Sequence, residues 1–179
     1  MPTTAVLLMD FQAGILDRFG TDPGLVSRIN ATAEAARSAG LPVLWIKVGF
    51  RPGYPEVSGR NRSFSAITTS RMFTDTDPGA DLHSDLEVRD TDVVVVKKRV
   101  SAFSGSDLDL VLRAAEVDSL ALAGIATSGV VLSTIRQAAD LDFRLTVLAD
   151  GCLDGDEEVH RVLVEKVFPR QAEVTTVEA

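Results

Sequence analysis

Short apolar runs alternate along the chain with longer amphipathic stretches. The runs are rich in Val, Leu, Ile and Ala and occupy residues 5–9, 42–48, 93–96, 119–123 and 145–148. Runs of this length without polar alternation are typical of strands that are buried on both faces of a parallel sheet. A last short run, at residues 173–176, gives a sixth predicted strand.

The stretches between these runs carry helix start and stop signals. Asp22 and Pro23 predict a capped N-terminus and Gly40 a stop for the first helix, and Ser106 predicts the cap of another. The predicted helices span residues 24–39, 107–115, 130–141 and 156–167. Strands that alternate with helices at this spacing predict a Rossmann-like, three-layer α/β/α sandwich around a six-stranded, mostly parallel sheet.

Residues 49–82 interrupt this alternation. The segment is rich in Gly, Pro, Ser, Thr and Arg and has no clean periodicity, which predicts a long functional loop or lid. It is not typical of a domain linker, because apolar side chains recur through it, at Phe50, Tyr54, Phe64, Ile67, Met72 and Phe73. A length of 179 residues with 45% hydrophobic content predicts a single domain over residues 1–179.

The charge of the chain indicates which kind of molecule it binds. The formal net charge is −8, and the longest basic run is the triplet from Lys97 to Arg99, which argues against binding to nucleic acid or to an anionic membrane. A small molecule is the expected partner. No apolar run approaches the roughly 20 residues that cross a bilayer, and no signal peptide is evident, so we expect a cytoplasmic protein. A lone cysteine, Cys152, cannot form an intrachain disulfide.

Three chemically distinctive features follow the ends of predicted strands. Asp10 closes the first apolar run, Lys97 closes the four-valine run, and a glycine-punctuated turn at residues 124–129 follows the run 119–123. In parallel α/β sheets, ligands bind beyond the carboxyl ends of the strands. We therefore expect the acid, the amine and the turn to face one crevice.

Asp10 and Lys97 each have a catalytic and a structural interpretation. Burial would raise the pKa of Asp10 and a nearby ammonium would lower it, which suits proton transfer near neutrality. Alternatively, Asp10 caps the turn that follows it, and Lys97 is a purely structural partner. Lys98 has the opposite strand parity and is predicted to face solvent.

The turn at 124–129 matches neither a phosphate-binding loop nor the GxGxxG dinucleotide pattern. It instead offers backbone N–H groups and a helix N-terminus to an anion or a developing oxyanion. The only histidines, His83 and His160, lack the spacing of a zinc site, so no metal or cofactor is expected. His160 is predicted to be a surface or partner-contact residue of an amphipathic helix.

Three ordered motifs resemble those of the isochorismatase-like hydrolases, also called the cysteine hydrolase family. They lie at residues 8–12, around Asp10, at residues 97–103, from Lys97 to Phe103, and at residues 124–134. The resemblance implies the strand order 3-2-1-4-5-6 and a catalytic pair of Asp10 and Lys97. It also implies homodimers or homotetramers.

The resemblance further implies a non-proline cis peptide between Ile125 and Ala126, with Gly129 in the same oxyanion-binding turn. Val130 then stands where the family has its nucleophilic cysteine. Valine has no lone pair, so the covalent thioester route is closed at that position. The nearby hydroxyls of Ser128, Ser133 and Thr134 are not paired with a base by any motif, and Cys152 is more typical of inert packing. The histidine-containing metal cluster of the nicotinamidase branch has no counterpart after residue 48.

Substrate contacts are predicted from aromatic and basic residues. Phe11, Gln12, Tyr54 and Phe103, with Trp45 and Phe50, could line an apolar pocket, although aromatics at strand ends are commonly core residues. Arg51, Arg60 and Arg62 make residues 49–82 locally basic, and Arg51 is the candidate ligand for a substrate carboxylate. Surface salt bridges are the alternative for these arginines.

Two functions are compatible with these features. The first is hydrolysis of a small, anionic compound such as a carboxylated enol ether, with Asp10 as general acid and no covalent intermediate. The second is a degenerate enzyme that keeps the pocket as a ligand-binding or interaction module.

Overall fold

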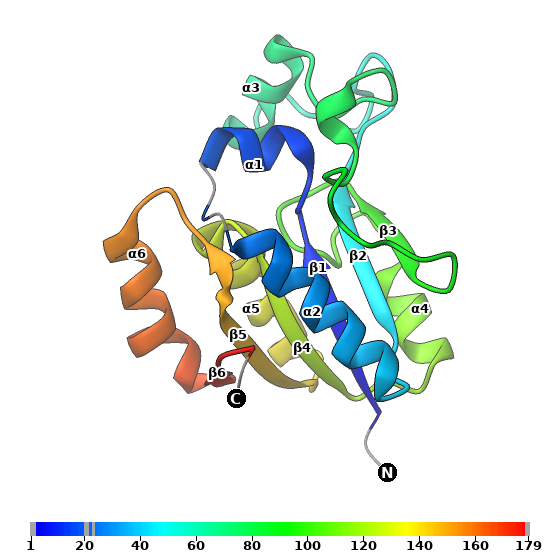
Figure 1. The fold of residues 1–179 in the computed structure, drawn as a ribbon. Coiled ribbons are helices and arrows are strands. Elements are labelled where there is room, and N and C mark those ends of the chain that lie inside the picture. Colours follow the sequence, from blue (N-terminus) through cyan, green and yellow to red (C-terminus); the bar gives the residue numbers. More distant parts are fainter. Residues whose placement is uncertain (1–2, 20–21, 23, 178–179) are drawn as a thin grey trace.

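The computed structural model describes residues 3–19, 22 and 24–177. Its centre is one six-stranded sheet with the order β3-β2-β1-β4-β5-β6, in which every neighbouring pair of strands is parallel (Figure 1). The strands are β1 (Thr4–Met9), β2 (Val43–Val48), β3 (Val93–Lys97), β4 (Ser119–Ile125), β5 (Arg144–Leu153) and β6 (Glu173–Thr175). The predicted fold class and strand order are thus confirmed.

Helices cover both faces of the sheet. They are α1 (Ala13–Phe19), α2 (Leu25–Ser38), α3 (Arg62–Ser70), α4 (Leu108–Ala114), α5 (Leu132–Asp140) and α6 (Glu157–Val162), with the shorter helical segments η1 (Pro78–Ala80), η2 (Thr127–Val131), η3 (Leu163–Val167) and η4 (Phe168–Arg170). In Figure 1, α2 lies in front of the sheet and α4 and α5 lie behind it.

Side chains of β1 alternate between the two apolar cores that this layering creates. Leu7 packs with Leu112 and Ile135, from α4 and α5, on one face, whereas Leu8 packs with Ile29, from α2, on the other. A strand buried on both faces needs apolar residues at every position, which explains why the sequence of β1 is a nearly continuous apolar run.

The prediction of burial on both faces is wrong for β3. Three of its valines, Val93, Val94 and Val96, are 36%, 45% and 37% exposed, and only Val95 and Lys97 are buried. The physical reason is position: β3 is an edge strand that pairs with β2 alone, so its outward side chains have no neighbouring strand or helix against them.

Residues 49–82 are folded rather than an irregular loop. They contain α3, whose first turn is capped by the side chain of Asn61, and η1, capped by Asp77. Their apolar side chains form a third cluster that includes Phe50, Phe64 and Phe73. The helix escapes prediction because it is short and rich in Ser and Thr, which have modest helix propensity.

Other predicted boundaries shift by a few residues. β5 extends five residues beyond the predicted end at residue 148, so Cys152 lies within the strand rather than after it. The first long helix begins after Gly24, whose N–H donates to the Asp22 carboxylate, and Pro23 lies outside the described residues. Within the described part of the chain, no helix has both the length and the apolar composition needed to span a membrane.

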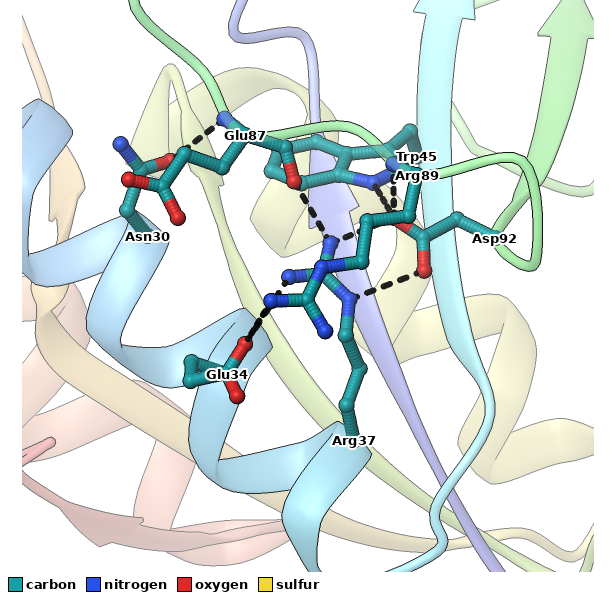
Figure 2. Close-up of polar contacts among 7 residues, drawn as sticks. All are labelled: Asn30, Glu34, Arg37, Trp45, Glu87, Arg89 and Asp92. Atoms are coloured by element: carbon teal, nitrogen blue, oxygen red, sulfur yellow. Dashed lines mark hydrogen bonds and ion pairs between the residues drawn. The ribbon is translucent and has the colours of Figure 1, made fainter.

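A polar cluster ties the segment before β3 to α2 and β2 (Figure 2). The buried carboxylate of Asp92 accepts hydrogen bonds from Arg37 at 2.5 and 3.0 Å, from Trp45 Nε1 at 2.9 Å and from the Arg89 backbone N–H at 3.0 Å. Arg37 also donates to the Glu87 carbonyl. Burial by itself would raise the pKa of Asp92, but these hydrogen bonds outweigh it and lower that pKa. The cluster anchors the chain that leads from residue 82 back to the edge of the sheet.

Replacing Asp92 by asparagine should lower the free energy of unfolding by about 3 kcal/mol, because removal of one member of a buried ion pair leaves the other uncompensated. Since the folded-state pKa of Asp92 is lowered, its contribution is present above the ordinary carboxyl pKa and is lost as pH falls through the folded value. Urea unfolding at several pH values measures both effects. Asp90→Asn, at an exposed position nearby, is the control and should cost little; equal losses in both variants would contradict the prediction.

Candidate active site

Asp10 and Lys97 meet at the carboxyl end of the sheet although their strands are not neighbours. Asp10 follows β1 with a φ of 62°, a left-handed conformation that aspartate tolerates better than most residues. Lys97 is the last residue of β3. The ammonium nitrogen of Lys97 lies 2.8 Å from Oδ2 of Asp10, and both side chains are buried. The predicted contact between the two residues is therefore present.

The ammonium group of Lys97 uses all of its donors within the protein. Besides Asp10, it donates to the carbonyl oxygens of Arg99 at 3.1 Å and Val100 at 2.9 Å. A lysine has three N–H donors, so none remains for a ligand. Lys97 can therefore fix the position of Asp10 and supply positive charge, without itself donating to a bound molecule.

The second carboxyl oxygen of Asp10 has no such partner. Oδ1 is buried and accepts no hydrogen bond from any described residue. Burial raises the pKa of Asp10, and Lys97 offsets this only in part, through its charge and its hydrogen bond. A buried carboxyl with a raised pKa and one oxygen without a partner is suited to exchange a proton with whatever occupies the space beside it.

The end of β4, just before the turn, packs closely against the end of β1. The peptide bond between Ile125 and Ala126 is cis, as predicted. A Cβ at Gly124 would lie 2.8 Å from the Met9 carbonyl oxygen and 2.9 Å from the Met9 Cβ, so only glycine permits this approach of β4 to β1. The close packing brings the turn beside the end of β1, and with it Val130.

Several backbone N–H groups of the turn already have partners. Those of Gly129 and Val131 donate to the Ala126 carbonyl at 3.0 and 3.3 Å, and that of Ser128 donates to the Asp154 carboxylate at 2.7 Å. These groups would have to exchange partners to bind an oxyanion. An oxyanion-binding role of Ile125, Ala126 and Gly129 stays a prediction.

A pocket of about 190 Å³ opens beside Asp10, bounded by α1, by α3 and the chain after it, and by the turn. Asp10, Lys97 and Arg18 are the charged residues in its wall. The remaining lining residues are apolar or glycine: Gly14, Ile15, Phe19, Val48, Phe64, Ile67, Met72, Phe73, Val100, Ile125, Ala126, Gly129 and Val130. Val130 is almost fully buried, and no Ser, Thr, Cys or His of the described chain lines the pocket.

Comparison with known proteins agrees with this geometry. The family described as the isochorismatase domain matches residues 4–179. The chain belongs to the isochorismatase family. Among curated relatives it is 32% identical to the isochorismatase family protein YecD of Escherichia coli O157:H7, over 98% of this chain and 93% of the relative. It is also 32% identical to the ureidoacrylate amidohydrolase RutB of Methylobacterium radiotolerans, over 92% of this chain and 73% of that protein.

Solved structures support the same assignment. A cysteine hydrolase from Pseudomonas syringae pv. phaseolicola 1448A superposes with a TM-score of 0.89 at 26% identity, covering 98% of this chain and 89% of that one. An isochorismatase family protein from Desulfovibrio vulgaris has a TM-score of 0.87 at 23% identity, over 100% and 96% of the two chains, and so shares the fold. The predicted family and the hydrolase class are thereby confirmed.

The five residues predicted to bind substrate do not line the Asp10 pocket of this isochorismatase-family chain. Phe11 and Phe103 are core residues. Gln12 is fully buried and bridges backbone groups of Val48 and Ala80, which leaves its amide no spare oxygen or nitrogen for a direct ligand contact. A role for these three in binding substrate stays a prediction.

The other two, Tyr54 and Arg51, lie farther along the chain. The Tyr54 hydroxyl donates to the carbonyl of Met72 and so supports one wall of the pocket from behind. Arg51 is exposed, pairs with Glu56 at 2.6 Å and lines a separate groove that also contains Lys47 and Lys98. Their substrate contacts likewise stay predictions.

Sequence reasoning missed the contribution of α1, which supplies Gly14, Ile15, Arg18 and Phe19 to the pocket wall. Their spacing places them along one side of a helix that begins directly after Asp10, and this spacing is the signal that could have indicated them. The wall residues from the segment 49–82, including Phe64 and Met72, were indicated by the recurrence of apolar side chains there.

Lys98, His160 and Cys152 lie outside the pocket, and the structure corrects or extends what the sequence predicts for each of them. Lys98 is half-buried rather than solvent-facing, because its ammonium group donates to the Gly49 carbonyl, and burial lowers its pKa. His160 is also half-buried and lies 2.8 Å from the Thr127 hydroxyl, since α6 packs beside the turn. The buried thiol of Cys152 donates to the Leu148 carbonyl, and burial raises its pKa to about 12, so it is a packing residue. The described residues contain no cluster of three or more metal-ligating His, Cys, Asp or Glu side chains.

Replacing Lys97 by methionine should raise the pKa of Asp10 further, because the only groups that lower it are the charge and the hydrogen bond of Lys97. NMR titration of the Asp10 carboxyl carbon measures this directly. The variant should also be less stable by about 3–5 kcal/mol at neutral pH. That loss should shrink at low pH, since a carboxyl with a raised folded-state pKa favours the folded state most when protonated and destabilises it as pH rises through that pKa.

Lys98→Met is the matched control, because Lys98 is the adjacent lysine and does not contact Asp10. It should leave the Asp10 titration unchanged. Parallel shifts of the Asp10 pKa in both variants would show that general charge, rather than the ion pair, controls this carboxyl.

Proposed function

We propose that this isochorismatase-family protein hydrolyses a small, acid-labile, carboxylated substrate, with Asp10 as the general acid and without a covalent intermediate. The observation that carries the proposal is the unpartnered Oδ1 of Asp10, on a carboxyl whose pKa is raised by burial and which faces a pocket. A carboxyl with a raised pKa keeps its proton to a higher pH than an ordinary carboxyl and can deliver it to an occupant of the pocket.

The described pocket wall contains no Ser, Thr, Cys or His side chain, which favours direct attack by water. Val130, which the family resemblance aligns with the nucleophilic cysteine, lines the pocket and has no lone pair. The thiol of Cys152 lies outside the wall and is held protonated by burial. The named activity of the RutB relatives is ureidoacrylate amidohydrolysis. Amides resist simple acid catalysis, whereas enol ethers are cleaved by it, so we favour an enol ether as the substrate class.

The proposed reaction on an enol ether has three steps. Asp10 transfers its proton to the terminal vinyl carbon, so that the C=C electrons form a C–H bond and the adjacent carbon becomes an oxocarbenium ion. Water then adds its oxygen to that carbon and returns a proton to the Asp10 carboxylate. The resulting hemiacetal or hemiketal breaks its C–O bond to give an alcohol and a carbonyl compound.

Lys97 has a positioning role in this scheme. Its charge stabilises the Asp10 carboxylate that exists after the first proton transfer, and its two bonds to backbone carbonyls keep the carboxyl oriented toward the pocket. Lys97 and burial have opposite effects on the proton of Asp10. Without Lys97 the carboxyl would keep its proton too strongly, and without burial it would lose the proton below neutral pH.

Asp10→Asn should reduce turnover of enol ethers by at least ~10²-fold, the lower end of what general acid catalysis contributes, because the amide cannot deliver and recover a proton. Wild-type kcat/KM should be constant at low pH and fall as pH rises through the raised pKa of Asp10, since the protonated form is the acid. Product formation from a panel of enol ethers, amides and esters measures both.

Thiol chemistry supplies the control. Iodoacetamide and Cys152→Ala should leave wild-type turnover unchanged, whereas Val130→Cys places a thiol in the pocket wall and should become sensitive to alkylation. Loss of turnover on Cys152→Ala, together with full activity of Asp10→Asn, would exclude the acid mechanism.

The lack of a Ser, Thr, Cys or His side chain in the described pocket wall also favours a second function, that of a ligand-binding or interaction module derived from an enzyme. No turnover across the whole panel, combined with measurable binding of a small carboxylate, would support this second function over the first.

A further inference from the structure

We infer that Arg18 selects the substrate by binding its carboxylate at the mouth of the Asp10 pocket. This inference rests on the proposed function, which identifies the part of the substrate that reacts at Asp10. It adds that the opposite end of the substrate carries a carboxylate.

Arg18 is placed at the pocket by the short helix that follows Asp10. Leu16 of α1 is buried in the core and fixes the orientation of the helix, while Gly14, Ile15 and Arg18 face the pocket. A spacing of four residues puts Arg18 one helical turn beyond Gly14 on the same side of α1. Arg18 is an exposed residue that lines the pocket, whereas Asp10, in the same wall, is buried.

The charges of the wall leave Arg18 as the only group suited to an anion. Asp10 and Lys97 are paired with each other, and the N–H donors of Lys97 are all in use. The guanidinium of Arg18 forms no hydrogen bond or ion pair with another residue of the described chain. Among the described residues, the positive charge of Arg18 therefore has no partner, in a protein with a net charge of −8. A guanidinium offers paired N–H donors that match the two oxygens of a carboxylate.

The same wall defines the rest of the substrate. Between Arg18 and Asp10 the pocket is apolar, with Ile15, Phe64 and Met72 among the lining residues. Its volume of about 190 Å³ is below the ~300–1,000 Å³ typical of sites for drug-sized ligands. A second carboxylate beside Asp10 would meet a like charge whenever Asp10 is ionised. The structure thus favours a small monocarboxylate whose apolar spacer separates the carboxylate from the bond that is cleaved.

A vinyl ether with a terminal carboxylate, vinyloxybutanoate, and its neutral amide provide matched probes. The dissociation constant of each is measured by calorimetry for the wild type and for Arg18→Gln, Arg18→Lys, Arg51→Gln and Arg170→Gln. Arg18→Gln should weaken binding of the carboxylate about ten-fold, the scale of a charge-assisted hydrogen-bonded contact, and leave binding of the amide unchanged. Arg18→Lys should restore part of the loss, because it keeps the charge but not the paired donors.

The two arginine controls separate local from general effects. Arg170→Gln removes an exposed charge outside the pocket wall and should leave both affinities unchanged. Arg51→Gln tests the residue that the sequence favoured for the carboxylate. Weakened carboxylate binding in Arg51→Gln but not in Arg18→Gln, equal losses for both probes in Arg18→Gln, or no binding of the carboxylate to the wild type would each overturn the inference.

The readout distinguishes this inference from the proposed function. If Arg18→Gln weakens carboxylate binding selectively and the wild type cleaves neither probe, Arg18 is the carboxylate ligand of a binding module and the hydrolytic proposal fails. If the wild type cleaves both probes with equal kcat/KM and Arg18→Gln binds them as the wild type does, the hydrolytic proposal stands and Arg18 is not a specificity residue.

Discussion

The ion pair between Asp10 and Lys97 is the constraint around which the carboxyl end of the sheet is organised. Removing two charges from water costs several kcal/mol for each, so a pair at this depth persists only when the remaining hydrogen-bonding groups are satisfied. The carbonyls of Arg99 and Val100 meet this need for Lys97, because the chain turns back immediately after β3. For Asp10 the need is only half met, because its Oδ1 accepts no hydrogen bond from any described residue.

The pocket depends on elements that the sheet itself does not supply. α1 and α3 close over the carboxyl end of the strands, and their apolar side chains exclude water from one side of Asp10 (Figure 1). This exclusion raises the pKa of Asp10, whereas Lys97 keeps the rise limited. The pocket wall and the ion pair therefore shift the pKa of Asp10 in opposite directions, and a change in either alters the acidity of this carboxyl.

Contacts outside the pocket help to position the strands that carry Asp10 and Lys97. Gly124 allows β4 to lie close enough to β1 for the following turn to reach the pocket. The Asp92 cluster anchors the chain entering β3, the strand that ends in Lys97 (Figure 2). The pocket of this isochorismatase-family chain thus places Asp10, Lys97 and Val130 in one wall.

The fold class and the meeting of Asp10 with Lys97 could be predicted from the apolar runs and from the rule that parallel strands end at one edge of a sheet. The strand order could be predicted only from the family resemblance. The residues of the pocket wall could not be predicted in either way. Phe11, Gln12 and Phe103 belong to the motifs yet are buried in the core, whereas Arg18 belongs to no motif and lines the pocket. Side-chain direction depends on how helices pack over the sheet, and that packing joins residues far apart in sequence, so no local pattern encodes it.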